Sequence, residues 1–343
     1  MSSRIRTVLI DDSAFMRKLI GDMIATDEAI ELVGIAANGR DGEQLALKLK
    51  PDVVITDMVM SDYDGTYVVS SLMDKQPVPI ILLSSLEKTD TRIFDALKGG
   101  AFEFIDKPTD YRSDNMRDYR LLDLIKEAAR VDVGHLKTSR NQKNNHQHSF
   151  ESLNYEVIVI GASTGGPGAI EYILTNLPSN LKIPVIVVQH MPARFIESFA
   201  TRLNENNTIR VKLASKGETL QGGVVYIAPG DANMRVDRNV ATGAPIITFT
   251  QKKYREFNNP SIDCLFESVA ETLGKHAIGV ILTGMGKDGA AGLKNIREQG
   301  GYTIAQDEAS SVVYGMPKVA HAMGAARQVV NLKEMPGFII SCL

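Results

Sequence analysis

Short apolar runs alternate with stretches of helical periodicity along the first third of the chain. The runs are rich in aliphatic and β-branched residues and cover residues 7–10, 31–37, 52–56, 80–83 and 102–105. Alternation of such runs with amphipathic helical segments is typical of a parallel sheet covered by helices. We therefore predict a (βα)5 α/β domain over residues 1–130.

A second alternating series begins with the four β-branched residues that start at Val157. Further apolar runs occupy residues 183–189, 224–228, 246–250, 277–283 and 302–306, and helical patterns separate most of them. The series predicts a doubly wound, mostly parallel sheet in a domain over residues 154–343. The runs at 224–228 and 246–250, with the turn N-A-T-G-A-P before the second, are expected to form an antiparallel hairpin.

The stretch between the two series is polar. Residues 119–130 place Leu121, Leu122, Ile125 and Ala129 on one helical face. Residues 137–152 then contain almost no aliphatic side chain, too little apolar surface to offset the entropy of ordering, so residues 131–153 are predicted to be a flexible linker. Two histidines there, His146 and His148, have no third metal ligand nearby and are expected to be solvated.

Length and composition narrow the class of protein. A chain of 343 residues favours two domains, and a net charge of -3 gives no reason to expect a nucleic-acid partner. Its two cysteines, Cys264 and Cys342, form neither a disulfide framework nor a zinc motif. There is no apolar run of about 18 residues and no signal peptide at the N-terminus, so a cytoplasmic protein without direct membrane insertion is expected.

Polar residues follow four of the five strands predicted in the first domain. Asp11 and Asp12 come after the first strand, Asp57 after the third, Ser84 after the fourth and Lys107 after the fifth. The carboxyl ends of parallel strands meet at one edge of the sheet, where such folds bind their ligands. Three carboxylates there would repel one another without a cation, and oxygen ligands suit Mg²⁺. One alternative is that Asp11, Asp12 and the following serine only cap a helix. That alternative would not explain why the other strand ends are polar too.

These residues resemble the receiver domain of two-component response regulators, a flavodoxin-like fold. The resemblance implies that Asp57 accepts a phosphoryl group from a chemotaxis histidine kinase, in the presence of Mg²⁺. It assigns the metal to Asp11, Asp12, Asp57 and the backbone carbonyl of Val59, phosphoryl contacts to Ser84 and Lys107, and the aromatic switch to Phe104. One departure is Ser61, where receivers usually carry proline; it removes no ligand.

The opening strand of the second domain runs into G-A-S-T-G-G-P, which fits G-x-S-x-G around Ser163. Such a tight turn lifts a hydroxyl above the carboxyl edge of the sheet, so Ser163 is the candidate nucleophile. A serine needs a base, and among six histidines His190 alone directly follows a buried run, at the same edge. Asp231, Asp288 and Asp307 all follow strands. We choose Asp288 because its glycine-rich loop, L-T-G-M-G-K-D-G, also brings backbone amides to the site.

The motifs G-A-S-T-G-G-P, V-Q-H-M-P and L-T-G-M-G-K-D-G resemble the catalytic domain of chemotaxis protein-glutamate methylesterases, a family that joins it to a receiver. The resemblance implies a triad of Ser163, His190 and Asp288, with Thr164 supporting His190 and the amide of Met285 in the oxyanion hole. Lys287 lies between loop residues that match. It further implies hydrolysis of glutamate γ-methyl esters on chemoreceptors to glutamate and methanol, without a cofactor, with deamidation of receptor glutamines by related enzymes. The expected location is the cytoplasmic side of chemoreceptor arrays.

Two other functions compete with this interpretation. A receiver-controlled protein that binds a nucleotide or phosphate would explain the glycine-rich turns, but not why His190 and Asp288 follow matching strands. A DNA-binding regulator would explain the receiver, but the second domain has no basic recognition-helix pattern.

Overall fold

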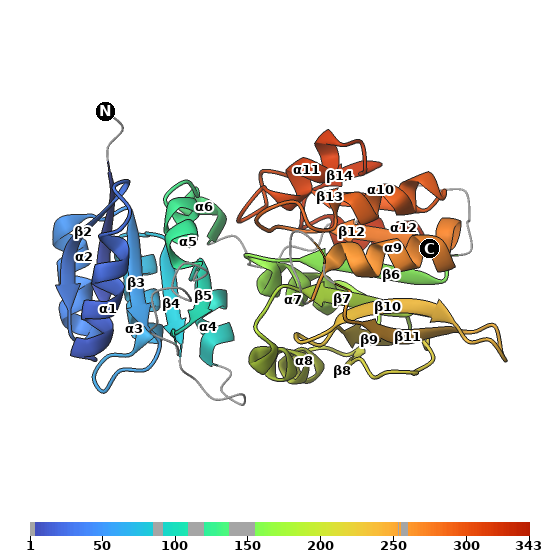
Figure 1. Ribbon diagram of the computed structural model, residues 1–343, viewed down its shortest axis with the longest axis horizontal. Helices are drawn as coiled ribbons and strands as arrows, with labels where there is room; N and C mark the ends of the chain where they lie inside the picture. The colour runs from blue at the N-terminus through green and yellow to red at the C-terminus, as the bar shows by residue number, and fades with distance from the viewer. Residues whose placement is uncertain (1–3, 85–91, 109–119, 137–154, 253, 255–259) are drawn as a thin grey trace. The chain divides into compact units, whose positions relative to one another are not determined.

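The computed structural model describes residues 4–84, 92–108, 120–136, 155–252, 254 and 260–343. The chain divides into two compact units, Met1–Thr138 and Ser139–Leu343, and each has a sheet of its own (Figure 1). None of the described helices is both long and apolar enough to cross a membrane.

The first unit confirms the (βα)5 prediction. Its parallel sheet has the order β2-β1-β3-β4-β5, and the strands are β1 (Ile5–Ile10), β2 (Ile30–Ala36), β3 (Val53–Asp57), β4 (Ile80–Ser84) and β5 (Glu103–Asp106). Every residue of β3 and β4 is buried, because helices cover both faces of a sheet connected in this way. The parallel register carries the carboxyl ends of β1 and β3 to the same edge.

Side chains cap the first three helices of this unit. The helices are α1 (Ala14–Ile24), α2 (Gly39–Leu49), α3 (Gly65–Lys75), α4 (Arg92–Lys98), α5 (Leu121–Ala128) and α6 (Val133–Leu136). Ser13 caps α1, since its hydroxyl accepts a hydrogen bond from the N–H of Met16 at 3.3 Å. The buried face of α5 differs in part from the predicted apolar face. Leu124 and Ala128 are buried, whereas Leu122 and Ala129 are only partly buried.

The short helix α6 lies inside the stretch that was expected to be a flexible linker. Its residues, 133–136, follow α5 after four residues, and Leu136 is buried. The remainder of the expected linker, from residue 137 on, lies outside the described residues, and so do His146 and His148.

The second unit is built on a wholly parallel seven-stranded sheet with the order β14-β13-β12-β6-β7-β9-β8. The strands are β6 (Val157–Ala162), β7 (Val185–Gln189), β8 (Arg210–Leu213), β9 (Val224–Ile227), β12 (Ala277–Ile281), β13 (Tyr302–Gln306) and β14 (Gln328–Val330). The two edge strands, β8 and β14, were not predicted, because each is only three or four residues long and β8 alternates with charged residues. Strand β6 lies centrally, between β12 and β7.

The predicted hairpin was assigned to the wrong strand. The antiparallel partner of β11 (Pro245–Thr250) is β10 (Asn233–Arg238), whereas β9 pairs in parallel with β7 and β8 (Figure 1). Polar residues interrupt the sequence of β10, N-M-R-V-D-R, so it lacks the apolar run that marked the other strands. The side chains of Met234 and Val236 nevertheless point into the core.

Helices complete the second unit. They are α7 (Gly166–Asn176), α8 (Ala193–Asn206), α9 (Ile262–Thr272), the 3₁₀ turn η2 (Gly274–His276), α10 (Ala290–Glu298), α11 (Met316–Ala322) and α12 (Met335–Ser341). Helix α10 packs between α9 and α11, while α7 packs against α12. The turn from β6 to α7 and the loop from β12 to α10 therefore leave neighbouring strands at the carboxyl edge of the sheet.

Candidate functional sites

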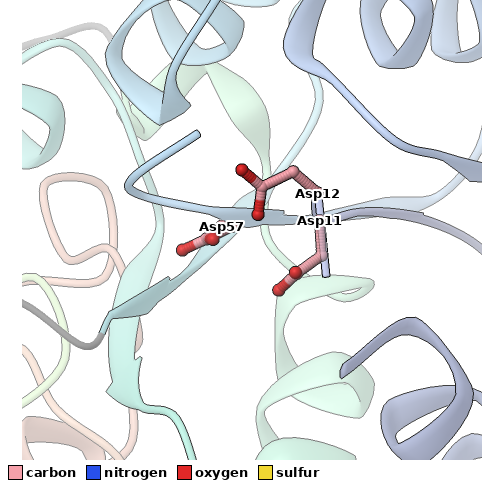
Figure 2. Close-up of side chains that lie close together, drawn as sticks. All are labelled: Asp11, Asp12 and Asp57. Atoms are coloured by element: carbon pink, nitrogen blue, oxygen red, sulfur yellow. The ribbon is translucent and has the colours of Figure 1, made fainter. Parts of the chain in front are cut away.

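Three carboxylates gather at the carboxyl edge of the first sheet (Figure 2). Asp11 and Asp12 directly follow β1, and Asp57 is the last residue of β3. One oxygen atom from each carboxylate lies within 4.8 Å of the other two. Asp11 and Asp57 are buried, while Asp12 is exposed. The structure thus brings together the three residues that the strand ends predicted to be neighbours.

Lys107 joins this cluster from the end of β5. Its ammonium nitrogen lies 2.8 Å from Oδ2 of Asp11 and 2.6 Å from Oδ2 of Asp57. Burial by itself would lower the pKa of Lys107, but hydrogen bonds to the two carboxylates raise it above its ordinary value. Burial also raises the pKa of Asp57, and the Lys107 ammonium opposes that rise. Lys107 therefore balances part of the negative charge at the edge.

Backbone N–H groups hold the three carboxylates in place. The N–H of Ser13 donates to Oδ1 of Asp11 at 2.9 Å, and that of Val59 donates to Oδ1 of Asp57 at 3.2 Å. The N–H of Ser61 donates to Oδ2 of Asp12 at 3.3 Å. Proline has no N–H, so the one departure from the usual receiver pattern supplies a hydrogen bond that proline could not make.

Two further predicted residues belong to the same sheet. Ser84 is the last residue of β4 and is fully buried, and its carbonyl oxygen accepts a hydrogen bond from the N–H of Lys107 at 2.8 Å. Phe104 lies buried in β5. The structure gives the strand positions of Ser84 and Phe104, and the roles assigned to them remain predictions.

In the second unit, Ser163 stands in a tight turn between β6 and α7. Gly165 has a φ of 75°, a left-handed conformation that favours glycine. The N–H of Ser163 donates to the carbonyl of Thr283 at 3.0 Å, which ties the turn to the loop after β12. A Cβ atom on Gly284 would lie 2.6 Å from Cβ of Ser163, so that loop packs directly against the serine.

His190 lies beside Ser163 because of strand register. Ala162 and Gln189, the last residues of β6 and β7, pair with each other, and the N–H of His190 donates to the carbonyl of Ala162 at 3.0 Å. Ser163 and His190 are the residues that follow this pair. The expectation that both leave the sheet at the same edge is thus met.

The side chains of His190 and Asp288 form a hydrogen-bonded pair. Nε2 of His190 lies 2.8 Å from Oδ2 of Asp288, and both side chains are almost wholly buried. A carboxylate can only accept in such a bond, so Nε2 carries the hydrogen. Nδ1 is then the ring nitrogen with a lone pair, which is the atom that a general base uses.

Four further donors surround the carboxylate of Asp288. Its Oδ1 accepts from the hydroxyl of Ser261 at 3.1 Å and from the N–H groups of Asp263 and Gly289 at 3.0 and 3.1 Å. Its Oδ2 also accepts from the N–H of Ile262 at 2.7 Å. Most of these donors belong to the first turn of α9, where the helix dipole favours an anion. The sequence did not reveal this arrangement, because 25 or more residues separate Asp288 from the α9 donors.

The same contacts set the ionisation of Asp288. Burial alone would raise its pKa, but the hydrogen bonds from His190 and from the N-terminus of α9 hold the pKa below its ordinary value. The neighbouring Asp263 behaves in the opposite way. Burial and the nearby charge of Asp288 raise its pKa from 3.8 to about 7, although the N–H of Gly292 donates to it at 2.7 Å. Asp288 is therefore the ionised member of the two.

The alternatives to Asp288 are differently placed. Asp231 is exposed, and the carboxylate of Asp307 accepts hydrogen bonds from Ser310 at 3.0 Å and Asn331 at 3.1 Å. Of these three aspartates, Asp288 is the one with a direct hydrogen bond to His190.

The two residues assigned to support and to the oxyanion hole lie in segments next to Ser163. Thr164 follows Ser163 and is buried, and its carbonyl accepts from the hydroxyl of Thr283 at 2.9 Å. Met285 follows Gly284 in the loop that packs against Ser163, and Lys287 is exposed in the same loop. Their roles remain predictions.

Comparison with known proteins identifies the families that the two units resemble. Residues 158–339 match the family model of the CheB methylesterase, and residues 7–115 match that of the response regulator receiver domain. A protein-glutamate methylesterase/protein-glutamine glutaminase of Pyrococcus abyssi is 38% identical, over 98% of this chain and 93% of the relative. One of Halalkalibacterium halodurans is 39% identical, over 99% of both chains.

The chain belongs to the family of protein-glutamate methylesterases/protein-glutamine glutaminases. The family joins a receiver to a hydrolase, as the strand-end residues and the G-x-S-x-G turn predicted. The crystal structure of the Thermotoga maritima CheB methylesterase catalytic domain is also similar, with 37% identity and a TM-score of 0.54, over 56% of this chain and 100% of that one. That coverage corresponds to the second unit alone.

Proposed function

We propose that this chain is a phosphorylation-regulated serine esterase that hydrolyses glutamate γ-methyl esters on chemoreceptors and also deamidates receptor glutamines. The observation that carries the proposal is the 2.8 Å contact between His190 and Asp288, beside the turn that presents Ser163. Family membership supports the substrate class.

In this proposal the hydroxyl of Ser163 attacks the ester carbonyl while Nδ1 of His190 takes its proton. The backbone amide of Met285 stabilises the oxyanion of the tetrahedral intermediate. The C–O bond to the methoxy group then breaks, and His190 returns the proton so that methanol leaves. Water, deprotonated by His190, cleaves the acyl-enzyme to give glutamate and free Ser163. An amide substrate follows the same steps and releases ammonia.

Asp288 makes His190 effective in two ways. It fixes the hydrogen on Nε2, and its charge stabilises the imidazolium that forms when Nδ1 accepts the proton. The donors at the N-terminus of α9 keep Asp288 ionised, so it remains an acceptor throughout.

The receiver residues fit a divalent cation. Three carboxylates within 4.8 Å of one another, two of them buried, provide the oxygen donors that Mg²⁺ prefers. Asp11, Asp12, Asp57 and the carbonyl of Val59 would hold the ion, which would neutralise charge during phosphoryl transfer. Asp57 accepts the phosphoryl group in this proposal, with a histidine kinase as donor and with Ser84 and Lys107 contacting its oxygens.

Phosphorylation is proposed to relieve inhibition of the esterase, and thereby to support sensory adaptation in chemotaxis at the cytoplasmic side of receptor arrays. A receiver held on the same chain has a high local concentration, so even weak docking over the Ser163 turn would hinder a bulky helical substrate. A coupling free energy of about 1–3 kcal/mol between the two states gives roughly 5–150-fold activation.

The test measures methanol released from methylated receptor membranes by the full-length protein. Ser163→Ala should lower the rate by on the order of 10⁴-fold or more, and a fluorophosphonate should label wild type but not this variant. A small-molecule phosphodonor with Mg²⁺ should raise the rate of wild type but not that of Asp57→Asn. Near-normal turnover by Ser163→Ala would refute the esterase mechanism, and equal activation of Asp57→Asn would refute the regulatory site alone.

A further inference from the structure

Gln189 is a buried polar residue at the carboxyl edge of the second sheet, where it ends β7 and directly precedes His190. Only 2% of it is exposed. Its side-chain Nε2 donates two hydrogen bonds, one to the carbonyl of Ser163 and one to the carbonyl of His190, each at 2.9 Å. One amide group thus bridges the main chain of the proposed nucleophile and that of the proposed base.

The chemistry of the two partners determines the orientation of this amide. Both are carbonyl oxygens, which only accept, so the NH₂ group must face them and both of its hydrogens are used. The other end, Oε1, is buried and accepts no hydrogen bond from the residues that the structure describes. A buried acceptor without a partner is unfavourable, and an apolar side chain would avoid that cost. The benefit of a glutamine at this position must therefore come from the two hydrogen bonds that its NH₂ group donates.

The two hydrogen bonds of the Gln189 amide lie just beyond the end of the β6–β7 pairing, next to Ser163 and His190. The last ladder bond between β6 and β7 runs from the N–H of His190 to the carbonyl of Ala162. Beyond it the chain turns into α7 on one side and toward α8 on the other. The N–H of Ser163 is directed to Thr283, on the opposite side of β6. The Gln189 amide supplies the remaining link, from Ser163 back to the β7 side.

Gly166 gives independent support. A Cβ atom at this residue would lie 2.1 Å from Oε1 of Gln189 and 2.8 Å from Cβ of Ala162. Gly166 is not among the glycines with positive φ, so its backbone conformation does not demand glycine. The first residue of α7 instead leaves room for the Gln189 amide.

We infer that Gln189 is a positioning residue of the hydrolase, whose side-chain amide fixes the main chain of Ser163 relative to that of His190. The inference rests on the proposed roles of Ser163 and His190. Gln189 touches neither the substrate nor the reacting atoms in this account. Its effect is on the distance and angle between hydroxyl and imidazole, to which acyl transfer is sensitive.

The main test compares Gln189→Met with wild type in the full-length chain, because methionine keeps the length of the side chain and removes both donors. Misplacement of a catalytic group by about 1 Å costs on the order of 10²-fold, so kcat should fall to that extent with KM unchanged. Labelling by a fluorophosphonate should slow in parallel. Thr303→Val is the matched control. Thr303 is fully buried near the amino end of β13, where its hydroxyl accepts from the N–H of Arg327 at 3.0 Å.

Two further variants separate positioning from general loss of stability. In Gln189→Glu the introduced carboxyl can donate only when protonated, so the ratio of its rate to that of Gln189→Met should rise as the pH is lowered. Gly166→Ala should reproduce the loss of kcat while Gln189 is intact, because the added methyl group displaces the amide.

The outcomes are distinct. A lower kcat for Gln189→Met and Gly166→Ala at unchanged KM, with Thr303→Val near wild type, supports the inference. Wild-type kcat in folded Gln189→Met, a loss equal to that of Thr303→Val, or a pH-independent rate ratio would overturn it while leaving the esterase proposal intact. Should Gln189→Met fail to fold, the kcat of Gly166→Ala relative to that of Thr303→Val decides by the same criterion. If Ser163→Ala is fully active, the proposed function fails, and the inference fails with it.

Discussion

Replacing Asp288 by asparagine tests the His190–Asp288 pair most directly, because the substitution keeps shape and removes only one charge. An asparagine oxygen can stand at one of the two carboxylate positions, and the NH₂ group must take the other. Three donors point at Oδ1 and two, His190 and Ile262, point at Oδ2. The oxygen is therefore expected at the Oδ1 position, with the NH₂ group facing His190.

That orientation of the asparagine changes the tautomer of the His190 imidazole. The NH₂ group needs an acceptor, so Nε2 of His190 must give up its hydrogen and Nδ1 must take it. Nδ1 can then no longer accept the proton of Ser163. In serine hydrolases of known mechanism, the corresponding change lowers kcat by about 10⁴-fold through the wrong tautomer. We expect a loss of that order here, together with slow fluorophosphonate labelling.

The substitution also has a stability cost that the assay must take into account. The N–H of Ile262, which lies 2.7 Å from Oδ2, would face another donor. An unsatisfied buried donor costs about 1–3 kcal/mol, which is less than the roughly 5–15 kcal/mol of a typical domain. The variant should remain folded, with a lower melting temperature, and rates are to be expressed per folded protein.

Asp263→Asn provides the matched control. Asp263 lies in the same turn of α9, and the raised pKa of about 7 means that an uncharged side chain is already well tolerated there. Its rate should stay within a few-fold of wild type. If folded Asp288→Asn hydrolyses methyl esters within about tenfold of wild type, far from the 10⁴-fold expected, Asp288 does not orient His190. If both variants lose activity equally, the effect belongs to the α9 turn as a whole.

Three further predictions concern the rest of the molecule. Asp57→Asn should abolish labelling by a phosphodonor, since an amide forms no acyl phosphate; undiminished labelling would exclude Asp57 as the acceptor. Glu43→Leu should lower the free energy of unfolding by about 1–3 kcal/mol in chemical denaturation, because the buried carboxylate accepts from Tyr67, Ser71 and Lys75. Burial opposes ionisation of Glu43, but these donors hold its pKa at about 2 instead of 4.5, so the difference from wild type should shrink as the pH falls through that interval. For Asp263 the sign is opposite: a pKa raised from 3.8 to about 7 means that its contribution to stability declines as the pH rises through that interval, and Asp263→Asn should flatten the slope.

Strand ends were the most informative feature of the sequence. Buried parallel strands leave an unbroken apolar run, and the polar residues that follow it mark the carboxyl edge. Asp57 and His190 were both located in this way, and the structure places each beside its predicted neighbours. The same criterion failed for β10, whose alternating polar residues concealed a strand that faces the core on one side only.

Contacts between distant segments could not be predicted from periodicity. The start of α9, which Ser261 caps, also surrounds the carboxylate of Asp288, and no sequence pattern indicated that contact. Gln189 was seen only as the end of an apolar run, since a lone glutamine gives no indication of which carbonyl groups its amide meets. Such partners depend on how loops from different strands meet, which register and burial decide.

The carboxyl edges of the two sheets stabilise negative charge by different means. The receiver places the ammonium of Lys107, a full positive charge, against the carboxylates of Asp11 and Asp57. The hydrolase uses backbone N–H groups at the start of α9, together with the hydrogen bond from His190, to keep Asp288 ionised. A full positive charge beside Asp288 would oppose the imidazolium that forms on His190 during catalysis. Fixed dipoles stabilise the carboxylate without a full opposing charge, so in the proposed mechanism the charge of Asp288 remains available to His190 when the proton of Ser163 is transferred.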